Sequence, residues 1–446
     1  MGKKLIWLAS SLIFTGTIAP VWALNSSVDE RGINALKLHQ LPYDLLGRKI
    51  GIGQVEIGRP GKFGLDKAGV KNKAIDPHGV FYRDAWALSN KNIDNHATMV
   101  ASVMISNSKD LKGVAPEAKL YASAVGSLQE GGQAQECLAT QHVALQNGGD
   151  VRAINFSFGE SLARDSREDA KLDGKALLTE CIDWSARFHD VLYVVAGNQG
   201  KGGIPIPTDN FNGITTAYST KRQGIFTKVD FANLSALPVG IGRTLIKKEI
   251  NYGARRAISL LAPGSNISIY NQRGQIEQVS GTSFAAPHIT ASVALLQEYG
   301  DRVMENNSTY LEAGLDLSRP LCSLDCRRHE VMKAILLNSA DKIKDRGDGL
   351  FLGMEKTILS EKNFNWLESD AYRNPRIPLD MQMGTGQLNV FRAYQQFRAG
   401  QTAPDVLAPN IGWDYRTVEV NSYQDYVLAQ PLSPGSYISI TLNWDR

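Results

Sequence analysis

The stretch Gly281-Thr-Ser-Phe-Ala-Ala-Pro-His288 joins a glycine and two hydroxyl residues to a run of small apolar side chains. The apolar pattern continues through Leu296 with helical spacing, which predicts a buried helix that begins close to Ser283. Pro287 is tolerated near a helix start because the first N–H groups have no partner within the helix. Ser283 could serve there as an N-cap, or as a nucleophile whose own backbone N–H helps to hold an oxyanion. This stretch alone leaves both interpretations open.

The composition indicates a large globular protein. The chain has 446 residues, of which 43% are hydrophobic, and this length suits one large domain and a smaller one. The formal net charge of +3 is too small to indicate a nucleic-acid-binding surface, so no nucleic-acid partner is expected.

The N-terminus has the features of a secretory signal peptide at residues 1–23. Lys3 and Lys4 precede an apolar run, and Ala23 is a small residue at the expected cleavage position. Ser, Thr, Gly and Pro interrupt the run, so it is a poor membrane span, and no later stretch is long and apolar enough to cross a bilayer. We therefore expect an exported protein, secreted or periplasmic, with no membrane span after signal removal.

Export permits disulfides, and the chain has four cysteines. Cys322 and Cys326 lie close together in a polar loop, whereas Cys137 and Cys181 fall in separate helical patterns. We expect pairing within each of these sets. A metal site is less favoured because His329 is the only histidine nearby and no double CxxC motif is present.

Apolar strands alternate with helical patterns between residues 49 and 400, after a lead-in at 24–48 without clear periodicity. This order predicts an α/β domain with a doubly wound parallel sheet and helices on both faces. In such a sheet the site lies at the carboxyl ends of the strands. The strands are expected near 49–57, 119–125, 151–157, 191–196, 214–217 and 257–261. The helices are expected from 96, at 133–147 and 181–189, after Ser283, and at 330–340 and 390–397.

The sequence changes character from about Thr402, so residues 401–446 are predicted as a linker and a short C-terminal β segment. Residues 423–432 and 437–444 alternate like two strands about a Ser433-Pro-Gly435 turn. Two or three strands do not make a stable sandwich alone. Either this hairpin packs on the main domain, or the chain stops inside a larger β domain, and we favour the second interpretation.

Four segments carry recognisable motifs in order: 95–101, 154–159, 195–200 and 281–288. They read Asn-His-Ala-Thr-Met-Val-Ala, Ile-Asn-Phe-Ser-Phe-Gly, Val-Ala-Gly-Asn-Gln-Gly and the serine stretch above. Together they resemble the histidine helix, the substrate-pocket strand, the oxyanion-asparagine turn and the nucleophile segment of the subtilisin-like serine peptidases, the subtilase family. The resemblance covers about residues 49–398, and it implies the subtilisin-like fold and a secreted serine endopeptidase.

The resemblance also implies roles for individual residues. Ser283 would attack the peptide carbonyl to form an acyl-enzyme, and His96 would act as general base and then as general acid. Asn198 would donate its side-chain amide to the oxyanion, together with the backbone N–H of Ser283. The partner would be a protein or peptide substrate.

Substrate binding is expected at Ser157, Phe158 and Gly159. These residues would offer backbone groups that pair with an extended peptide. The other histidines lack such motifs. His288 follows Ser283 by five positions on the same helix and should point elsewhere.

The acid position departs from the family pattern, because Glu56 stands where an aspartate is expected. Glutamate can orient His96, but its extra methylene moves the carboxylate by roughly 1.5 Å. A misplacement of about 1 Å can cost about a hundredfold in rate. Asp94 is the nearest rival as the acid, and Asp66 and Asp84 are weaker ones. We favour Glu56.

Two further hypotheses stay open. In a transamidating or macrocyclising relative, an amine would resolve the acyl-enzyme instead of water. In a subtilase-fold binding protein, catalysis would be weak, as Glu56 and the Ala97 that replaces the usual glycine suggest. No cofactor is required by the expected chemistry, and a structural calcium ion is possible although no carboxylate loop for one is legible.

Overall fold

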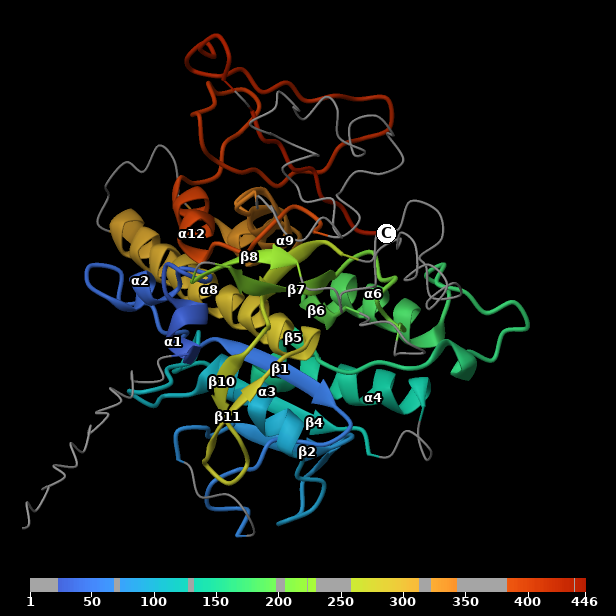
Figure 1. Cartoon of the computed structure of the whole chain (residues 1–446). Coiled ribbons are helices and arrows are strands. Elements are labelled where there is room, and N and C mark those ends of the chain that lie inside the picture. Colours follow the sequence, from blue (N-terminus) through green and yellow to red (C-terminus); the bar gives the residue numbers. More distant parts are fainter. Residues whose placement is uncertain are drawn as a thin grey trace, which may run out of the picture.

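A twisted sheet runs through the middle of the chain in the computed structural model, and helices lie on both of its faces (Figure 1). The structure describes residues 23–67, 73–126, 132–197, 205–222, 224–229, 258–312, 322–342, 383–436 and 438–446. Residues 1–22 of the expected signal peptide lie outside these ranges. Among the helices within them, none has the length and apolar character to cross a membrane.

Five parallel strands form the middle of the sheet. They are β1 (Gly51–Glu56), β4 (Lys119–Ala124), β5 (Val151–Phe156), β6 (Leu192–Ala196) and β7 (Ile214–Arg222). β1 lies between β4 and β5, β6 follows β5, and β7 follows β6. Because all five run in parallel, their carboxyl ends meet along one edge of the sheet, where a site is expected.

Shorter strands complete the sheet. β2 (Gly79–Tyr82) joins β4 in parallel and carries the antiparallel β3 (Ala85–Trp86). On the other side, β7 pairs with the antiparallel β8 (Ile225–Val229) and with the parallel β9 (Leu260–Pro263). A separate hairpin is formed by β10 (Ile267–Tyr270) and β11 (Ile276–Val279).

Helices cover the two faces of the sheet. α3 (Asn95–Ile105) and α8 (Thr282–Glu312) lie on one face, and α4 (Gln133–Ala144) and α6 (Leu177–His189) on the other. Successive strand residues divide between them: Leu192 packs in the cluster that includes α3 and α8, whereas Tyr193 packs in the cluster of α4 and α6. The predicted doubly wound α/β fold is therefore confirmed. Elsewhere among the described residues, the longer helices are α9 (His329–Asn338) and α12 (Val390–Arg398).

The segment before β1 belongs to the main core. α1 (Ala23–Val28) and α2 (Leu36–His39) contribute Val28 and Leu38, which are fully buried. Ser27 Oγ lies 2.9 Å from Nε2 of His288, a residue of α8. The sequence placed residues 24–48 in a separate lead-in because such short helical pieces show no clear periodicity.

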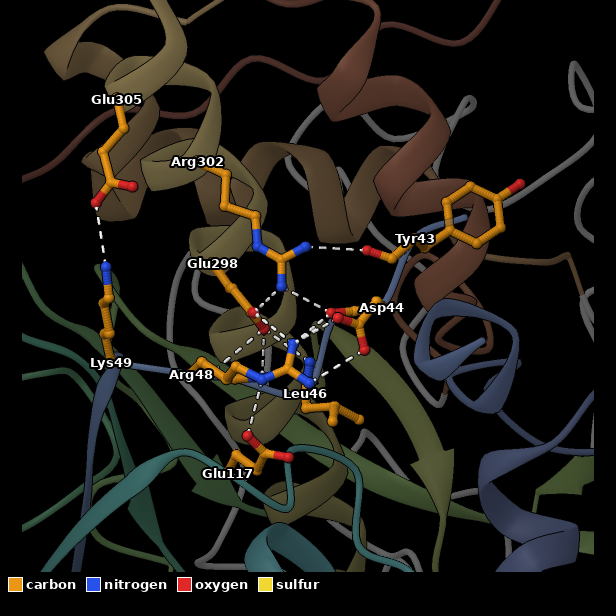
Figure 2. Close-up of polar contacts among 10 residues, drawn as sticks. Tyr43, Asp44, Leu46, Arg48, Lys49, Glu117, Glu298, Arg302 and Glu305 are labelled. Atoms are coloured by element: carbon orange, nitrogen blue, oxygen red, sulfur yellow. Dashed lines mark hydrogen bonds and ion pairs between the residues drawn. The ribbon is translucent and has the colours of Figure 1, made fainter. Parts of the chain in front are cut away.

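Figure 2 shows how the end of this segment is fixed to α8. Oε2 of Glu298 accepts hydrogen bonds from the backbone N–H groups of Leu46 at 2.7 Å, Gly47 at 2.6 Å and Arg48 at 3.2 Å. Oε1 of Glu298 accepts from the guanidinium groups of Arg302 and Arg48. Both oxygens of this buried carboxylate therefore have donors, which is what allows a buried charge to be retained.

The C-terminal segment differs from its prediction. Where the structure describes it, it forms isolated bridges and no strand, so the two strands expected at 423–432 and 437–444 are wrong. The alternating apolar side chains find no sheet to cover them, and Leu442 stays 80% exposed. Its last residues contact α9, where the hydroxyl of Thr441 donates to Asn338 Oδ1 at 3.0 Å.

Both expected cysteine pairs lie within bonding distance. Cys137 pairs with Cys181 and Cys322 with Cys326, and the Cα atoms are 5.9 Å and 5.6 Å apart. The first pair joins α4 to α6 across one face of the sheet.

Candidate active site

Glu56 ends the central strand β1 at the edge where the parallel strands terminate. Its side chain is 3% exposed. The amide of Gln54 donates to Oε1 of Glu56 at 2.9 Å and to the carbonyl of Ala97 at 2.9 Å. Gln54 thus links the carboxylate to the first turn of α3. Gln54 lies on the same face of β1 as Glu56. The sequence did not predict its role because it belongs to no motif.

His96 lies in the first turn of α3, and its Nδ1 is 2.8 Å from Oε2 of Glu56. Because a carboxylate can only accept, Nδ1–H is the donor and Nε2 is left to act as a base. Burial lowers the pKa of His96, but the charge and hydrogen bond of Glu56 and the charge of Asp94 raise it more. The net result is a pKa above the usual value of 6.5.

The rival acids make other contacts. Asp94 is the N-cap of α3, and its Oδ1 accepts from the backbone N–H of Ala97 at 2.8 Å. Asp66 is buried and forms a two-pronged ion pair with Arg59, at 2.7 Å and 2.8 Å. The carboxylate that accepts the hydrogen bond of the His96 ring is therefore that of Glu56.

Ser283 is the second residue of α8 and reaches the end of β5. Its hydroxyl donates to the carbonyl of Ser157 at 3.2 Å, and the hydroxyl of Ser157 donates to the carbonyl of Ser283 at 2.9 Å. The amide of the buried Asn155 in turn donates to Ser157 Oγ at 2.8 Å. These contacts fix the start of α8 against the substrate strand predicted at 157–159.

Two ring contacts extend this arrangement. The ring of His96 lies 5.5 Å, centroid to centroid, from that of Phe284, the residue after Ser283. The structure thus brings together the first turns of α3 and α8. Phe158 is buried and stacks on Phe156 at 5.0 Å.

The backbone of Phe158 and Gly159 follows the end of β5. Neither residue has a backbone hydrogen bond to any other part of the chain that the structure describes. Such unpaired N–H and C=O groups suit the addition of an extended peptide. Asn198 lies outside the described residues. Gly197, just before it, accepts a hydrogen bond from Thr282 Oγ1 at 2.7 Å, which ties the end of β6 to the start of α8.

Two histidines outside this group are fully engaged. His288 is buried, and Nδ1 lies 2.7 Å from the carbonyl of Phe284, so Nδ1–H donates there and Nε2 accepts from Ser27. Burial lowers the pKa of His288 to about 4. As expected, it points away from the candidate site.

His329, in a cluster with Asp190 and Glu330, has the geometry of a possible metal ligand. However, its Nδ1 lies 2.7 Å from Asp190 and its Nε2 lies 3.1 Å from Asp445. Burial lowers the pKa of His329, but these carboxylates raise it to about 9. A doubly donating imidazolium has no lone pair for a metal, so the cluster is explained as an ion pair.

Part of the chain is similar in sequence to known proteins. The model of the subtilase family matches residues 71–355. Subtilisin E of Bacillus subtilis (strain 168) is 27% identical over 216 residues, which are 46% of this chain and 48% of that protein. Tripeptidyl-peptidase 2 of Drosophila melanogaster is 25% identical over 215 residues, which are 45% of this chain and 14% of that protein. The chain therefore spans about half or less of these relatives.

One solved structure of similar shape is that of the prenylagaramide maturation protease PagA. It is 18% identical to this chain, with a TM-score of 0.46, and the superposition covers 79% of this chain and 95% of that chain.

Proposed function

Because the chain belongs to the subtilase family, we propose that it is a serine endopeptidase that cleaves protein or peptide substrates through an acyl-enzyme on Ser283. The observation that carries the proposal is the 2.8 Å hydrogen bond between His96 Nδ1 and Glu56, at the edge where Ser283 begins α8. A buried carboxylate behind a histidine, and a serine at the start of the neighbouring helix, are parts that acyl transfer by serine needs.

In the proposed reaction, His96 Nε2 takes the proton of Ser283 as the hydroxyl attacks the peptide carbonyl. The hydroxyl now donates to Ser157 and has to turn to His96 when substrate binds, since catalytic hydrogen bonds are often formed only in the complex. The imidazolium then returns the proton to the leaving amine. Water then attacks the acyl-enzyme while His96 Nε2 takes a proton from it. His96 returns this proton to Ser283 Oγ as the acid product leaves.

Glu56 is proposed as the orienting acid. It holds Nδ1–H of His96 and stabilises the imidazolium that forms during the reaction. Its own second oxygen is held by Gln54, which offsets the freedom that the longer side chain of glutamate brings. Asp94 contributes its charge and caps α3.

The oxyanion is proposed to be held by the backbone N–H of Ser283 at the start of α8 and by the amide of Asn198. The role of Asn198 rests on its sequence motif. Phe158 and Gly159 are proposed to pair with the peptide backbone. The mechanism needs no cofactor. Export is proposed from the basic and apolar N-terminal sequence.

A fluorophosphonate probe tests the proposal, because it reacts only with an activated serine. The wild type should be labelled at Ser283, and Ser283→Ala should not. Absence of labelling in a folded wild type would leave a binding protein as the explanation. Mass analysis of the products of a peptide digest then separates hydrolysed ends from cyclic or ligated peptides, which a transamidating relative would make.

A further inference from the structure

Two buried glutamates lie next to the proposed substrate strand, and their carboxylates lack hydrogen-bond donors among the described residues. Glu136 is in the first turns of α4, and Glu160 follows Gly159 directly. Glu136 is 1% exposed and Glu160 is 0% exposed. Within the described chain, none of their four carboxylate oxygens has a hydrogen-bond donor. Buried carboxylates left this way are costly, so the pair requires an explanation.

Rigid elements hold both residues in place. The backbone of Glu160 pairs with Ile206, with N–H to carbonyl distances of 2.8 Å and 3.1 Å. The short helix η1 (Leu162–Arg164) follows, and the side chain of Gln133 at the start of α4 donates to the carbonyl of Arg164 at 3.4 Å. The backbone around the two glutamates is therefore held by contacts with Ile206 and between η1 and α4.

The cation nearest to the pair in the described chain serves it only in part. Nε of Arg164 lies 3.4 Å from one oxygen of Glu160, and this arginine is 37% exposed. Among the described residues, the oxygens of Glu136 have no hydrogen-bond partner. Burial, and then the hydrogen bond and charge of Glu160, raise the pKa of Glu136 far above that of an ordinary carboxyl, although Arg164 opposes this. Without a ligand, the two carboxyls therefore hold a proton between them.

We propose that Glu136 and Glu160 bind the cationic side chain of a lysine or arginine in the peptide substrate. The proposal rests on the peptidase function above. Glu160 is three residues after Ser157, so their Cα atoms lie within about 10 Å of each other. The carbonyl of Ser157 contacts the hydroxyl of Ser283. A peptide that pairs with Phe158 and Gly159 therefore passes close to the glutamates.

A basic side chain carries enough N–H donors for the carboxylate oxygens of Glu136 and Glu160. A guanidinium carries five N–H donors and an ammonium three, and both prefer carboxylate acceptors. Because both carboxyls are covered, the cation enters as the peptide docks, and it takes the place of the shared proton, which is released. The two carboxylates are then paired with the cation instead of sharing a proton.

A calcium ion fits less well. Calcium takes six to eight oxygen ligands, and the glutamates supply two carboxylates. Among the described residues, the groups of three or more acidic or histidine side chains that could share an ion lie elsewhere, around Glu56 and around His329.

Matched fluorogenic peptides test the proposal. The two peptides of each pair differ at a single position among the four residues before the cleaved bond. At that position one peptide carries lysine and the other norleucine, or one carries arginine and the other citrulline. At one position the wild type should prefer the basic peptide by roughly 10- to 100-fold in kcat/KM, the usual effect of a hydrogen-bonded buried charge. Glu136→Gln and Glu160→Gln should each lose most of this preference and cleave the neutral peptide within about threefold of the wild type.

Glu180→Gln is the matched control, because Glu180 is exposed on α6 and its loss removes the same charge without touching the pair. It should keep the preference. Equal cleavage of basic and neutral peptides by a wild type that the fluorophosphonate labels would overturn the proposal while the peptidase function stands. Failure of labelling would instead reject the peptidase function. Stoichiometric binding of Ca²⁺ that Glu160→Gln abolishes would assign the pair to a metal and also overturn the proposal.

Discussion

Glu298 on α8 and the Glu136–Glu160 pair beside β5 are both buried and acidic, but their surroundings differ. Three backbone N–H groups and two guanidinium groups surround Glu298, and all of them come from the segment before β1 or from α8 itself (Figure 2). The oxygens of the pair have no donor in the described chain. A carboxylate with a full set of donors stabilises the fold, whereas one without donors is stable only with a proton or a ligand.

Glu56 lies between these two cases. One of its oxygens accepts from Gln54 and the other from His96, whose protonation is proposed to change during the reaction. The number and kind of donors thus distinguish the structural carboxylate of Glu298 from the proposed positioning carboxylate of Glu56 and the proposed ligand-binding pair. The following changes test that distinction, in order of the expected effect.

Glu56→Gln should lower kcat by about 10³- to 10⁴-fold, because an amide no longer fixes the tautomer of His96 or stabilises its imidazolium. Stability should change little. Steady-state kinetics with one fluorogenic peptide measure the effect. Asp94→Asn is the control, since asparagine also caps a helix, and it should stay near wild type. A large loss in Asp94→Asn alone would make Asp94 the acid.

Glu298→Ala should lower the free energy of unfolding by about 2–4 kcal/mol, because three backbone N–H groups lose their acceptor and Arg48 and Arg302 each lose one of theirs. Urea unfolding measures this change. Glu305→Ala on the same helix is the control. Glu305 is exposed, pairs with Lys49 at 3.4 Å, and should contribute less than about 1 kcal/mol. Equal effects of the two changes would contradict the distinction.

Glu136→Gln should stabilise the fold, in contrast to Glu298→Ala. It should raise the free energy of unfolding by about 1 kcal/mol at neutral pH, because it removes a buried carboxyl that lacks donors. The pKa of Glu136 is raised in the fold above the ordinary 4.5, so the folded state binds more protons. The wild type therefore loses stability as pH rises above 4.5, and the stability difference in favour of the variant grows with pH. Melting curves at several pH values test this, and destabilisation at neutral pH would refute it.

The pH profile of kcat/KM should show the smallest effect. The base has to be neutral, and the pKa of His96 is raised, so activity should rise with a midpoint above 6.5. In Glu56→Gln the residual activity should rise at a lower pH, because the neighbouring negative charge is gone. An unchanged midpoint would show that another group controls this limb.

Much of the fold could be predicted because apolar runs that end in small or polar residues define the strands of a buried parallel sheet. The same runs placed Glu56 and Ser157 at strand ends. The choice between Glu56 and Asp94 needed coordinates, although Asp94 fits an N-cap three residues before Ala97. The C-terminal alternation misled because periodicity shows which faces could be buried and cannot show what would bury them.

The Glu136–Glu160 pair could not be found in the sequence. Its members lie on a helix and after a strand, and neither belongs to a local motif. Asn155 and Gln54 were missed for the same reason, since both act through a neighbour two positions away on the same face of a strand. Contacts of this kind depend on the packing of separate elements.

The contacts of Ser27 with His288 and of Leu46 with Glu298 span 261 and 252 positions of the chain. Contacts between such distant positions form late, because a long loop has to close before they stabilise anything. During synthesis, the early segment therefore emerges long before the helix that receives it. The core at the start of α8, which carries Ser283, is completed only when this segment docks, so the proposed peptidase activity should appear among the last steps of folding.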